Sequence, residues 1–458
     1  MNIDFKALVL KYKDQMIKDT QDLLRIDSEL TTFDPERIGA PFGEGNKQAL
    51  DFMLNMANKD GFRTENVDGY AGHIEFGDSE DYIGSIGHLD VVPAGTGWTY
   101  PPYGAEIHDN KIYARGAEDD KGPTMAVYYA MKILKEEGIK LSKRIKLILG
   151  IDEESGWRCV NYYFKKYPQA PVAGFISDAD FPLIYAEKGI TSTIIRGSFD
   201  NSVVRKIEGG LRSNMVPESA RAYIVKDLAY KEKFENYLKE HNLVGKVSVD
   251  DEELILEVEG KSAHGSLPQD GVNAIHLMFN ALNYMGISNE FIEFVNKYLN
   301  NDYLGVKLGI AYTDKEMGEL TVNWGTLKTE GNRFEIVLNL RYPNGVNYQK
   351  DVFEHIETLL IEDYKVTVEH HQKLLYKDPN SHLIKTLMGI YKKHTGDESP
   401  AISIGGGTFA RATDNVVAFG PHFPGKPTYI HQKDEFIDID DLITATIIYT
   451  ESFYELAK

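Results

Sequence analysis

Residues 145–156, IKLILGIDEESG, decide the fold, because an apolar run of strand length ends there in an acidic turn. Residues 82–87 and 173–177 have the same character of short buried strands. Between the strands at 82–87 and 145–151, residues 123–137 open with Pro123 and stop just before a glycine, which favours a helix. Strands that alternate with helices predict an α/β domain with a mostly parallel sheet.

The rest of the chain shows two kinds of pattern. Helices are expected over 5–26, 157–167, 381–395 and 440–456, a strand over 416–420, and a hairpin over 106–114 that turns at Asp109–Asn110. From about residue 190 to 378, alternating strands are interrupted by helices near 271–285 and 347–362. We therefore predict an α/β domain made of residues 1–189 and 379–458, with an inserted α+β domain, residues 190–378, that has room for two subdomains.

Length and charge exclude several classes of protein. A chain of 458 residues exceeds one ordinary hydrophobic core, so two large domains or about three smaller ones are expected. The 50 Lys and Arg against 70 Asp and Glu give a net charge of −20, which disfavours nucleic acid and anionic membranes as partners. No run approaches the ~18 consecutive apolar residues of a membrane-spanning helix.

The cysteine count and the N-terminal residues predict the compartment. A single cysteine, Cys159, excludes an internal disulfide and a cysteine-based zinc site. The opening residues, MNIDFKALVLKYKDQM, place Asp4 early and contain no apolar stretch of signal-peptide length. We therefore expect a cytoplasmic protein.

Carboxylates and imidazoles occur at four predicted strand ends, and a late histidine can complete the set. They are His88 and Asp90 in GHLDVVP, Asp119 in RGAEDDKGP, Glu153 and Glu154 in DEESG, Asp178 in SDAD, and His431 in HQKDE. Each alone has a plainer explanation, such as a capping aspartate, a solvated acidic turn or a surface histidine. Together they gather at one edge of a parallel sheet, where sites form. Carboxylates with imidazoles and no thiolates suit Zn²⁺, Mn²⁺ or Co²⁺, and a carboxylate bridging two ions is the two-metal hydrolase design.

These motifs also resemble a known family. GHLDVVP, RGAEDDKGP, DEESG, SDADFP, GKSAHGSLP, NLRYP, GGGTFAR and HQKDE match in order, over nearly the whole chain, the ArgE/DapE/aminoacylase/carboxypeptidase G metallopeptidase family. The chain is most similar to the PepV-type dipeptidase branch. The resemblance implies a di-metal catalytic domain, residues 1–189 and 379–458, with a lid domain, residues 190–378. In one departure, Lys433 stands where branch members carry proline in HQPDE; it removes no ligand.

The resemblance implies two divalent ions, Zn²⁺ or Mn²⁺, with Co²⁺ as another option. Their ligands would be His88 and Asp178 for one ion, Glu154 and His431 for the other, and Asp119 as the bridge between them. Asp90 would orient His88, because a metal-bound imidazole usually gives its other N–H to a carboxylate. Glu153 would be the general base, since neighbouring side chains in a turn diverge and one of them can face the substrate water.

The resemblance also assigns residues of the lid domain to the substrate. His264 in GKSAHG would donate to the scissile carbonyl oxygen and so stabilise charge that develops in the transition state. Asn214 and Arg341 would bind polar ends of the substrate, and the Arg341 fork fits a carboxylate. Backbone N–H groups at Gly406 and Gly407 would add donors. From the residues alone, His264 is a surface-loop histidine and Arg341 a rim salt bridge.

These expectations describe a metal-dependent dipeptidase that hydrolyses short peptides with a free C-terminal carboxylate. The nearest alternative is an N-acyl amino acid deacylase or desuccinylase with the same metal chemistry. A non-catalytic metal or peptide binder is a second alternative, which Glu153 disfavours because a binder needs no base. We expect a monomer acting on a small peptide, because the inserted region is long enough for one chain to supply His264 to its own site.

Overall fold

The computed structural model describes residues 3–250 and 252–458, which form two compact units. The first unit contains the chain up to Tyr185, Lys377–Ile402 and Thr408–Lys458. The inserted unit contains Ala186–Tyr376 together with Ser403–Gly407. Residues 403–407 were expected in the first domain. They group with the inserted unit because the Gly405 carbonyl accepts a hydrogen bond from Arg341 Nη1 at 2.9 Å.

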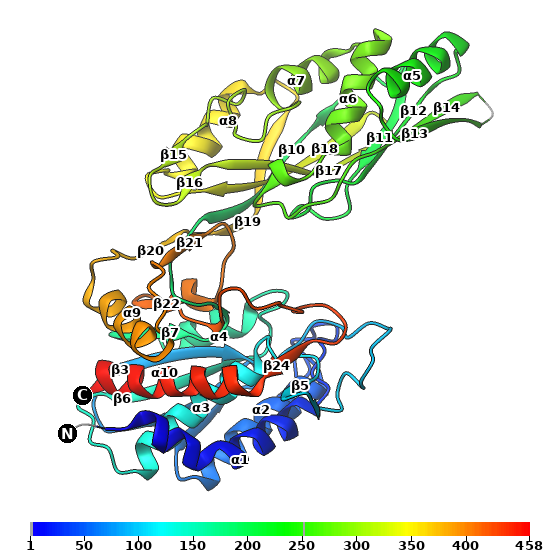
Figure 1. Ribbon diagram of the computed structural model, residues 1–458. Coiled ribbons are helices and arrows are strands. Elements are labelled where there is room, and N and C mark those ends of the chain that lie inside the picture. The colour runs from blue at the N-terminus through cyan, green and yellow to red at the C-terminus, as the bar shows by residue number, and fades with distance from the viewer. Residues whose placement is uncertain (1–2, 251) are drawn as a thin grey trace. The chain divides into compact units, whose positions relative to one another are not determined.

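The first unit is built on a nine-stranded sheet (Figure 1). Its strands, in spatial order, are β1 (Arg63–Val67), β2 (Ala71–Phe76), β6 (Arg144–Gly150), β3 (Tyr82–His88), β7 (Ala173–Ile176), β22 (Val416–Ala418), β9 (Ile184–Glu187) and β20 (Leu375–Tyr376), with β21 (Ile402–Ile404) paired to β9. Strands β6, β3, β7 and β22 are parallel at the centre, and the strands on either side pair antiparallel. The α/β class predicted from the sequence is confirmed, with its parallel pairing in the middle of the sheet.

Helices cover this sheet. They are α1 (Phe5–Leu24), α2 (Glu44–Lys59), α3 (Lys121–Glu136), α4 (Arg158–Lys166), α9 (His382–Thr395) and α10 (Ile439–Ala457). Helices α3 and α10 lie against each other and against β3 and β6, and α1 packs on both (Figure 1). Every residue of α3 from Lys121 to Leu134 is buried, as in a helix at the centre of a domain. The sequence analysis did not assign α2, although its buried Leu50, Met53 and Leu54 have helical spacing.

Two small strand groups tie distant segments together. Strands β4 (Glu106–His108), β5 (Lys111–Tyr113) and β24 (Phe436–Asp438) form a three-stranded sheet, β8 (Ala179–Asp180) pairs with β23 (Pro421–His422), and η3 covers Phe409–Arg411. The β4–β5 hairpin turns at Asp109 and Asn110, whose φ angles are 48° and 62°. Because β24 pairs with β5, the segment just after His431 lies beside the segment that leads to Asp119.

The inserted unit has one large antiparallel sheet. Its strands, in spatial order, are β13 (Gly245–Asp250), β14 (Glu253–Glu259), β12 (Ser219–Val225), β11 (Val204–Gly209), β17 (Thr321–Glu330), β18 (Arg333–Tyr342), β10 (Gly189–Ser198) and β19 (Lys365–Gln372), and β15 (Thr313–Asp314) pairs with β16 (Gly318–Glu319). The helical segments are α5 (Leu228–Glu240), η1 (Pro268–Asp270), α6 (Ala274–Met285), α7 (Glu290–Tyr298), η2 (Tyr348–Phe353) and α8 (Glu354–Leu359). The sequence analysis had not assigned α5 and α7.

The inserted sheet has two different faces. Helices lie along one face (Figure 1), and that side holds the hydrophobic core, to which Phe334, Ile336, Leu338 and Leu340 of β18 belong. The alternate residues of β18 point to the opposite face. The described residues of this unit share one large sheet and one hydrophobic core, and the division into two subdomains stays a prediction.

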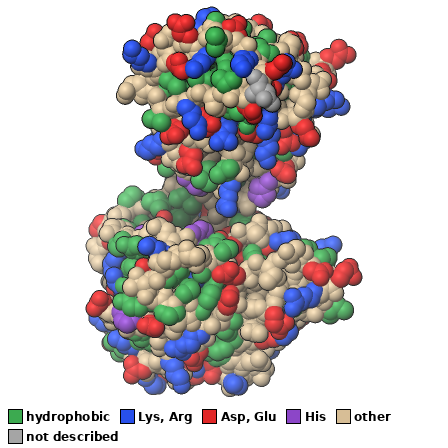
Figure 2. All heavy atoms as spheres, turned by 90° about the vertical axis from the view of Figure 1, so that its right-hand side faces the viewer, with side chains coloured by type: hydrophobic (Ala, Val, Ile, Leu, Met, Phe, Trp, Pro, Cys, Tyr) green, Lys and Arg blue, Asp and Glu red, His purple; other side chains and the backbone are tan. Residues whose placement is uncertain are grey.

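The net charge of −20 is not concentrated in one patch of the surface that Figure 2 presents. Acidic and basic side chains are interspersed over that face of both units (Figure 2). None of the helices in residues 3–250 and 252–458 has the length and apolarity that a membrane crossing requires.

Candidate metal centre

Parallel strand ends bring four of the predicted residues to one edge of the first sheet. His88 is the last residue of β3, Glu153 and Glu154 lie in the turn after β6, and Asp178 follows β7. Because β6, β3 and β7 are parallel neighbours, their carboxyl ends coincide. Asp119 comes to the same place from the segment before α3.

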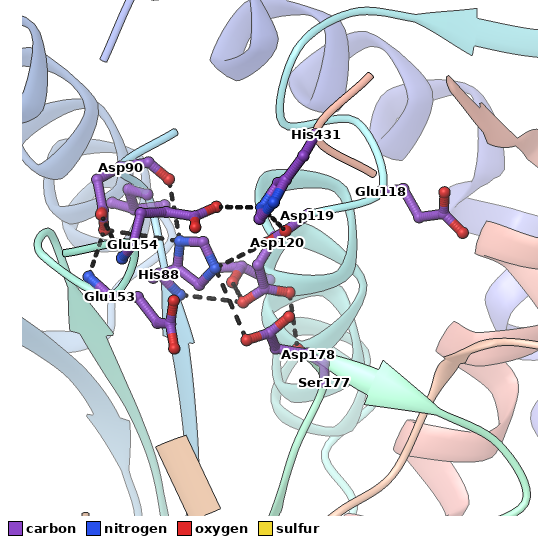
Figure 3. A network of polar contacts seen from close by, with 12 residues as sticks. His88, Asp90, Glu118, Asp119, Asp120, Glu153, Glu154, Ser177, Asp178 and His431 are labelled. Atoms are coloured by element: carbon purple, nitrogen blue, oxygen red, sulfur yellow. Dashed lines mark hydrogen bonds and ion pairs between the residues drawn. The ribbon is translucent and has the colours of Figure 1, made fainter. Parts of the chain in front are cut away.

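The Asp119 carboxylate lies at the centre of the cluster (Figure 3). Its Oδ1 is 2.9 Å from His88 Nε2, and its Oδ2 is 3.0 Å from His431 Nε2. His431 Nε2 is also 3.0 Å from Glu154 Oε1, and His88 Nε2 is 3.7 Å from Asp178 Oδ2. The two oxygens of one carboxylate therefore face two separate sets of side chains.

The possible metal-binding groups follow this division. His88, Asp119 and Asp178 form one set, and Asp119, Glu154 and His431 form another, each with ligand atoms within 4.8 Å of one another. A third set combines His88 with Glu153 and Glu154. The first two sets share only Asp119. They contain the five residues that the sequence analysis assigned as ligands.

Asp90 binds the turn after β6 more directly than it binds His88. Its Oδ1 accepts the Glu153 N–H at 3.0 Å and its Oδ2 accepts the Glu154 N–H at 3.1 Å. His88 Nδ1 lies 2.9 Å from the backbone oxygen of Asp90 and 3.6 Å from its carboxylate. The Asp90 segment thus orients the His88 ring through its carbonyl, while its carboxylate holds the backbone of Glu153 and Glu154 in the DEESG turn.

Three further carboxylates hold the site, and the sequence analysis gave none of them a role. Asp120 is fully buried and accepts hydrogen bonds from the His88 N–H at 3.0 Å and from Thr124 Oγ1 at 2.9 Å. Asp152 accepts the Arg158 fork, with Nε to Oδ2 and Nη2 to Oδ1 both at 2.7 Å. Adjacency to the ligand motifs was the one signal available in the sequence.

Glu435, the third, connects the His431 loop to Asp119. Its Oε1 accepts the backbone N–H groups of Glu118 at 3.0 Å and of Asp119 at 3.2 Å. Its Oε2 accepts Arg115 Nη1 at 2.5 Å. The side chain of Glu118, in contrast, points away from the cluster (Figure 3).

The crowded acids and histidines show perturbed protonation. Burial, followed by the Asp119 charge, raises the pKa of Asp178 to about 7. Burial also raises the pKa of Glu153 well above its usual value. Hydrogen bonds that the His431 ring donates to the Asp119 and Glu154 carboxylates raise the pKa of His431 to about 10. Without cations the cluster keeps protons at neutral pH, and divalent ions bound by oxygen and imidazole donors would replace them. The donor set thus fits a pair of such ions.

The predicted substrate residues form a second group, within the inserted unit. The Gly265 N–H donates to the Asn214 carbonyl at 2.8 Å, so the His264 loop lies beside the Asn214 loop. Arg341 is 4% exposed, and its Nε donates to Asn339 Oδ1 at 2.8 Å. Gly406 and Gly407 belong to the segment 403–407, whose Gly405 carbonyl accepts from Arg341.

Contacts of the His264 ring select its tautomer. The Ser266 N–H donates to Nδ1 at 3.3 Å, and Ser266 Oγ lies 2.6 Å from the same nitrogen. Since Nδ1 is an acceptor, the proton of the neutral ring is on Nε2. Burial and the positive charge of Arg341 lower the pKa of His264, which favours this neutral form. His264 therefore offers an Nε2–H donor at neutral pH.

Comparison with known proteins agrees with this geometry. The family described as Peptidase family M20/M25/M40 matches residues 85–455, and the chain belongs to that family. A Bacillus subtilis (strain 168) protein named "Putative dipeptidase YtjP" is 42% identical over 472 residues, covering 100% of both chains. A "Putative dipeptidase" of Staphylococcus epidermidis is 41% identical over 469 residues, covering 99% of both. The protein is thus a metal-dependent peptidase of this family.

Solved structures show the same fold at low identity. Human carnosine dipeptidase 1 superimposes with a TM-score of 0.57 at 16% identity, covering 99% of this chain and 98% of that one. The aminopeptidase PepT from Bacillus cereus superimposes with a TM-score of 0.57 at 18% identity, covering 97% and 99%. Both likenesses support the α/β domain with an inserted domain that the sequence predicts.

Proposed function

We propose that this protein is a dipeptidase that hydrolyses short peptides with a free C-terminal carboxylate. The observation that carries the proposal is the placement of Asp119, with one oxygen 2.9 Å from His88 Nε2 and the other 3.0 Å from His431 Nε2. This is the arrangement that a carboxylate bridging two ions needs. Relatives at 42% and 41% identity that are named as dipeptidases give the substrate class independent support.

The proposed ligands are His88 and Asp178 for one ion, Glu154 and His431 for the other, and Asp119 for both. Two bound divalent ions supply Lewis-acid polarisation of the scissile carbonyl and a lowered pKa for the attacking water. Oxygen and imidazole donors suit Zn²⁺ or Mn²⁺, and Co²⁺ as well.

Glu153 serves as the general base in the proposal. Its buried carboxyl has a raised pKa, so it takes a proton from the attacking water and holds it. It then delivers that proton to the leaving amine. Asp90, through the Glu153 N–H at 3.0 Å, keeps the base in its turn.

Residues of the inserted unit bind the substrate in the proposal. The Nε2–H of His264 donates to the carbonyl oxygen as negative charge develops on it. Arg341 and Asn214, with backbone N–H groups at Gly406 and Gly407, receive the C-terminal carboxylate. Closing the lid over a bound dipeptide excludes water from the reaction, and a longer peptide prevents closure.

Metal-stripped protein refilled with Zn²⁺, Mn²⁺ or Co²⁺ provides the test. Dipeptides should be cleaved faster than tripeptides, N-acetyl amino acids or N-succinyl amino acids under each metal that restores activity. Faster hydrolysis of the acylated amino acids would replace the proposal with a deacylase. Binding of metal and peptide without turnover of any substrate would replace it with a binding protein.

We also propose that the chain works as a monomer in the cytoplasm. A single buried cysteine, Cys159, gives the protein no disulfide to maintain in a reducing compartment. Light scattering at assay concentration tests the monomer. An obligate dimer in which mixed His264→Ala and Glu153→Gln chains regain activity would refute it.

A further inference from the structure

A polar cavity of about 480 Å³ lies on the open face of the inserted sheet. Strands β18, β10 and β19 supply its floor in two rows of paired residues. Arg341, Ile190 and Gln372 form one row. Asn339, Ser192 and His370 form the next row. Residues two apart on a strand share a face, so both rows face the same side, opposite the helices.

The wall of the cavity is the loop Arg212–Asn214. Asn323, paired with Asn339 in the sheet, anchors this loop: its Nδ2 donates to the carbonyls of Ser213 and Met215, each at 2.9 Å. Asn323 is fully buried, so the anchor is part of the folded core. The Arg212 side chain therefore rises from a fixed backbone.

The cavity is positively charged in a protein of net charge −20. Arg212 and Arg341 carry fixed charges, His370 lines the same cavity, and the described residues that line it include no carboxylate. No described residue forms an ion pair with the Arg212 side chain, which is exposed. Such a surface fits a ligand with more than one anionic group.

The two arginines differ in a way that suggests separate tasks. Arg341 is nearly buried and is held by Asn339 and the Gly405 carbonyl, so its position is fixed. Arg341 and His370 lie on the two strands that flank β10, and their rows are two residues apart along it. Their Cα atoms are therefore separated by two strand spacings and two residues, roughly 10–12 Å. Side chains that line one cavity from positions this far apart can each bind one of two carboxylates joined by a short carbon chain.

We infer that Arg212, with His370, binds an acidic side chain on the C-terminal residue of the substrate. This rests on the proposed function, in which Arg341 takes the α-carboxylate. The substrate class is then dipeptides that end in aspartate or glutamate. Ser192, Asn339 and Gln372 supply the polar floor beneath that side chain.

Ala-Glu and Ala-Gln test the inference, since the two dipeptides differ in one charged group and hardly in shape. The metal-loaded wild type should cleave Ala-Glu with a kcat/KM about tenfold or more above that for Ala-Gln, the share expected of a charge-assisted contact. Arg212→Gln should bring that ratio close to one, mainly by raising KM for Ala-Glu. Arg205→Gln, which alters an exposed arginine outside the cavity, should retain the wild-type ratio.

The outcomes separate this inference from the proposed function. A wild-type ratio near one, or a ratio that Arg212→Gln leaves unchanged, overturns the acidic subsite while the dipeptidase remains. Failure of the metal-loaded enzyme to cleave Ala-Ala, Ala-Gln and Ala-Glu alike overturns the dipeptidase and the subsite with it. A charge-reversed Arg212→Glu enzyme that now prefers Ala-Lys over Ala-Glu would support the subsite independently.

Discussion

Arg115 and Glu435, 320 residues apart in sequence, form a buried ion pair in which Nη1 lies 2.5 Å from Oε2. Both side chains are at most 2% exposed. The other Glu435 oxygen accepts the backbone N–H of Asp119. A residue four positions after His431 thereby fixes the position of the proposed bridging ligand, so the two halves of the metal centre depend on one carboxylate.

Glu435→Gln should weaken metal binding by about 10–100-fold, the usual effect of removing a partner that orients a ligand. Calorimetric titration of the metal-free protein measures this loss. Glu398→Gln, a change at a carboxylate that is 80% exposed, serves as the control. Glu435→Gln also leaves the Arg115 charge buried without its partner, so the melting temperature of this variant should fall. Wild-type metal affinity in a folded Glu435→Gln protein would contradict this account.

Glu153→Gln should retain the fold and both ions while kcat falls by about 10²–10⁴-fold, because a positioned base contributes that much. The amide keeps the shape of the side chain, and the backbone bond to Asp90 Oδ1 is unaffected. Glu154→Gln is the matched comparison and should lose metal as well as activity. Near-normal turnover by metal-loaded Glu153→Gln would remove the assignment of the base.

Asp119→Asn and Asp120→Asn should separate metal binding from folding. Asp119 faces both sets of ligands, so its substitution should lower the content of both ions, as read by elemental analysis. Asp120 instead accepts the His88 N–H at 3.0 Å and Thr124 Oγ1 at 2.9 Å, so its substitution should mainly lower the melting temperature. A greater metal loss in Asp120→Asn would show that the wrong aspartate of the pair has been assigned.

Arg341→Ala should reduce dipeptide cleavage strongly, because a charge-assisted contact to the C-terminal carboxylate is lost. Amidation of the dipeptide C-terminus should reproduce that loss in the wild type. It should have little additional effect in Arg341→Ala, since the two changes remove the same contact. Equal cleavage of free dipeptides, amidated dipeptides and tripeptides by the wild type would point to a general aminopeptidase.

Acid should destabilise the inserted unit through His276. Burial lowers the pKa of this histidine from 6.5 to about 4, and the ring is 2% exposed. Between these two pH values the unfolded chain binds more protons than the folded chain, so the free energy of unfolding rises with pH. The stability that the neutral His276 ring contributes is complete above about pH 6.5 and is lost as pH falls toward 4. In denaturant unfolding of the metal-stripped protein, His276 should make the free energy of unfolding rise by about 1.4 kcal/mol per pH unit in this range.

His276→Gln should remove that slope, whereas His241→Gln, at an exposed histidine of the same unit, should keep it. Trp324, whose ring centroid is 5.7 Å from that of His276, reports on the unit when Trp98 and Trp157 are replaced by phenylalanine. An unchanged slope in His276→Gln would assign the acid sensitivity to another group.

The sequence could predict the residues whose positions follow from strand direction. His88, Glu154 and Asp178 come after strands that are parallel neighbours, so a local pattern and one topological rule place them together. The bridging role of Asp119 and the ligand role of His431 came from the family resemblance, because neither residue follows a strand of the predicted parallel sheet. The α/β class and the inserted domain also follow from the alternation of elements.

The contacts that support the site could not be predicted in the same way. Arg115 meets Glu435 only because β24 pairs with β5, and no local pattern carries that pairing. His88 and Asp90 alternate in an extended chain, which suggested a side-chain contact, yet the backbone carbonyl of Asp90 meets the ring. The two rows of the polar cavity depend on β10 lying between β18 and β19, a strand order that periodicity does not specify.

The position of α10 after the inserted unit in the sequence bears on how the protein is made. Residues of α10 from Leu442 to Ala457 are largely buried, and the helix lies against α3. A ribosome completes Ala186–Tyr376 long before it releases α10. At roughly 5–20 residues per second, the nascent α3 waits on the order of tens of seconds for its covering helix. During translation the inserted unit can fold early, while the metal-binding unit keeps an apolar surface that chaperones would recognise until α10 has been made.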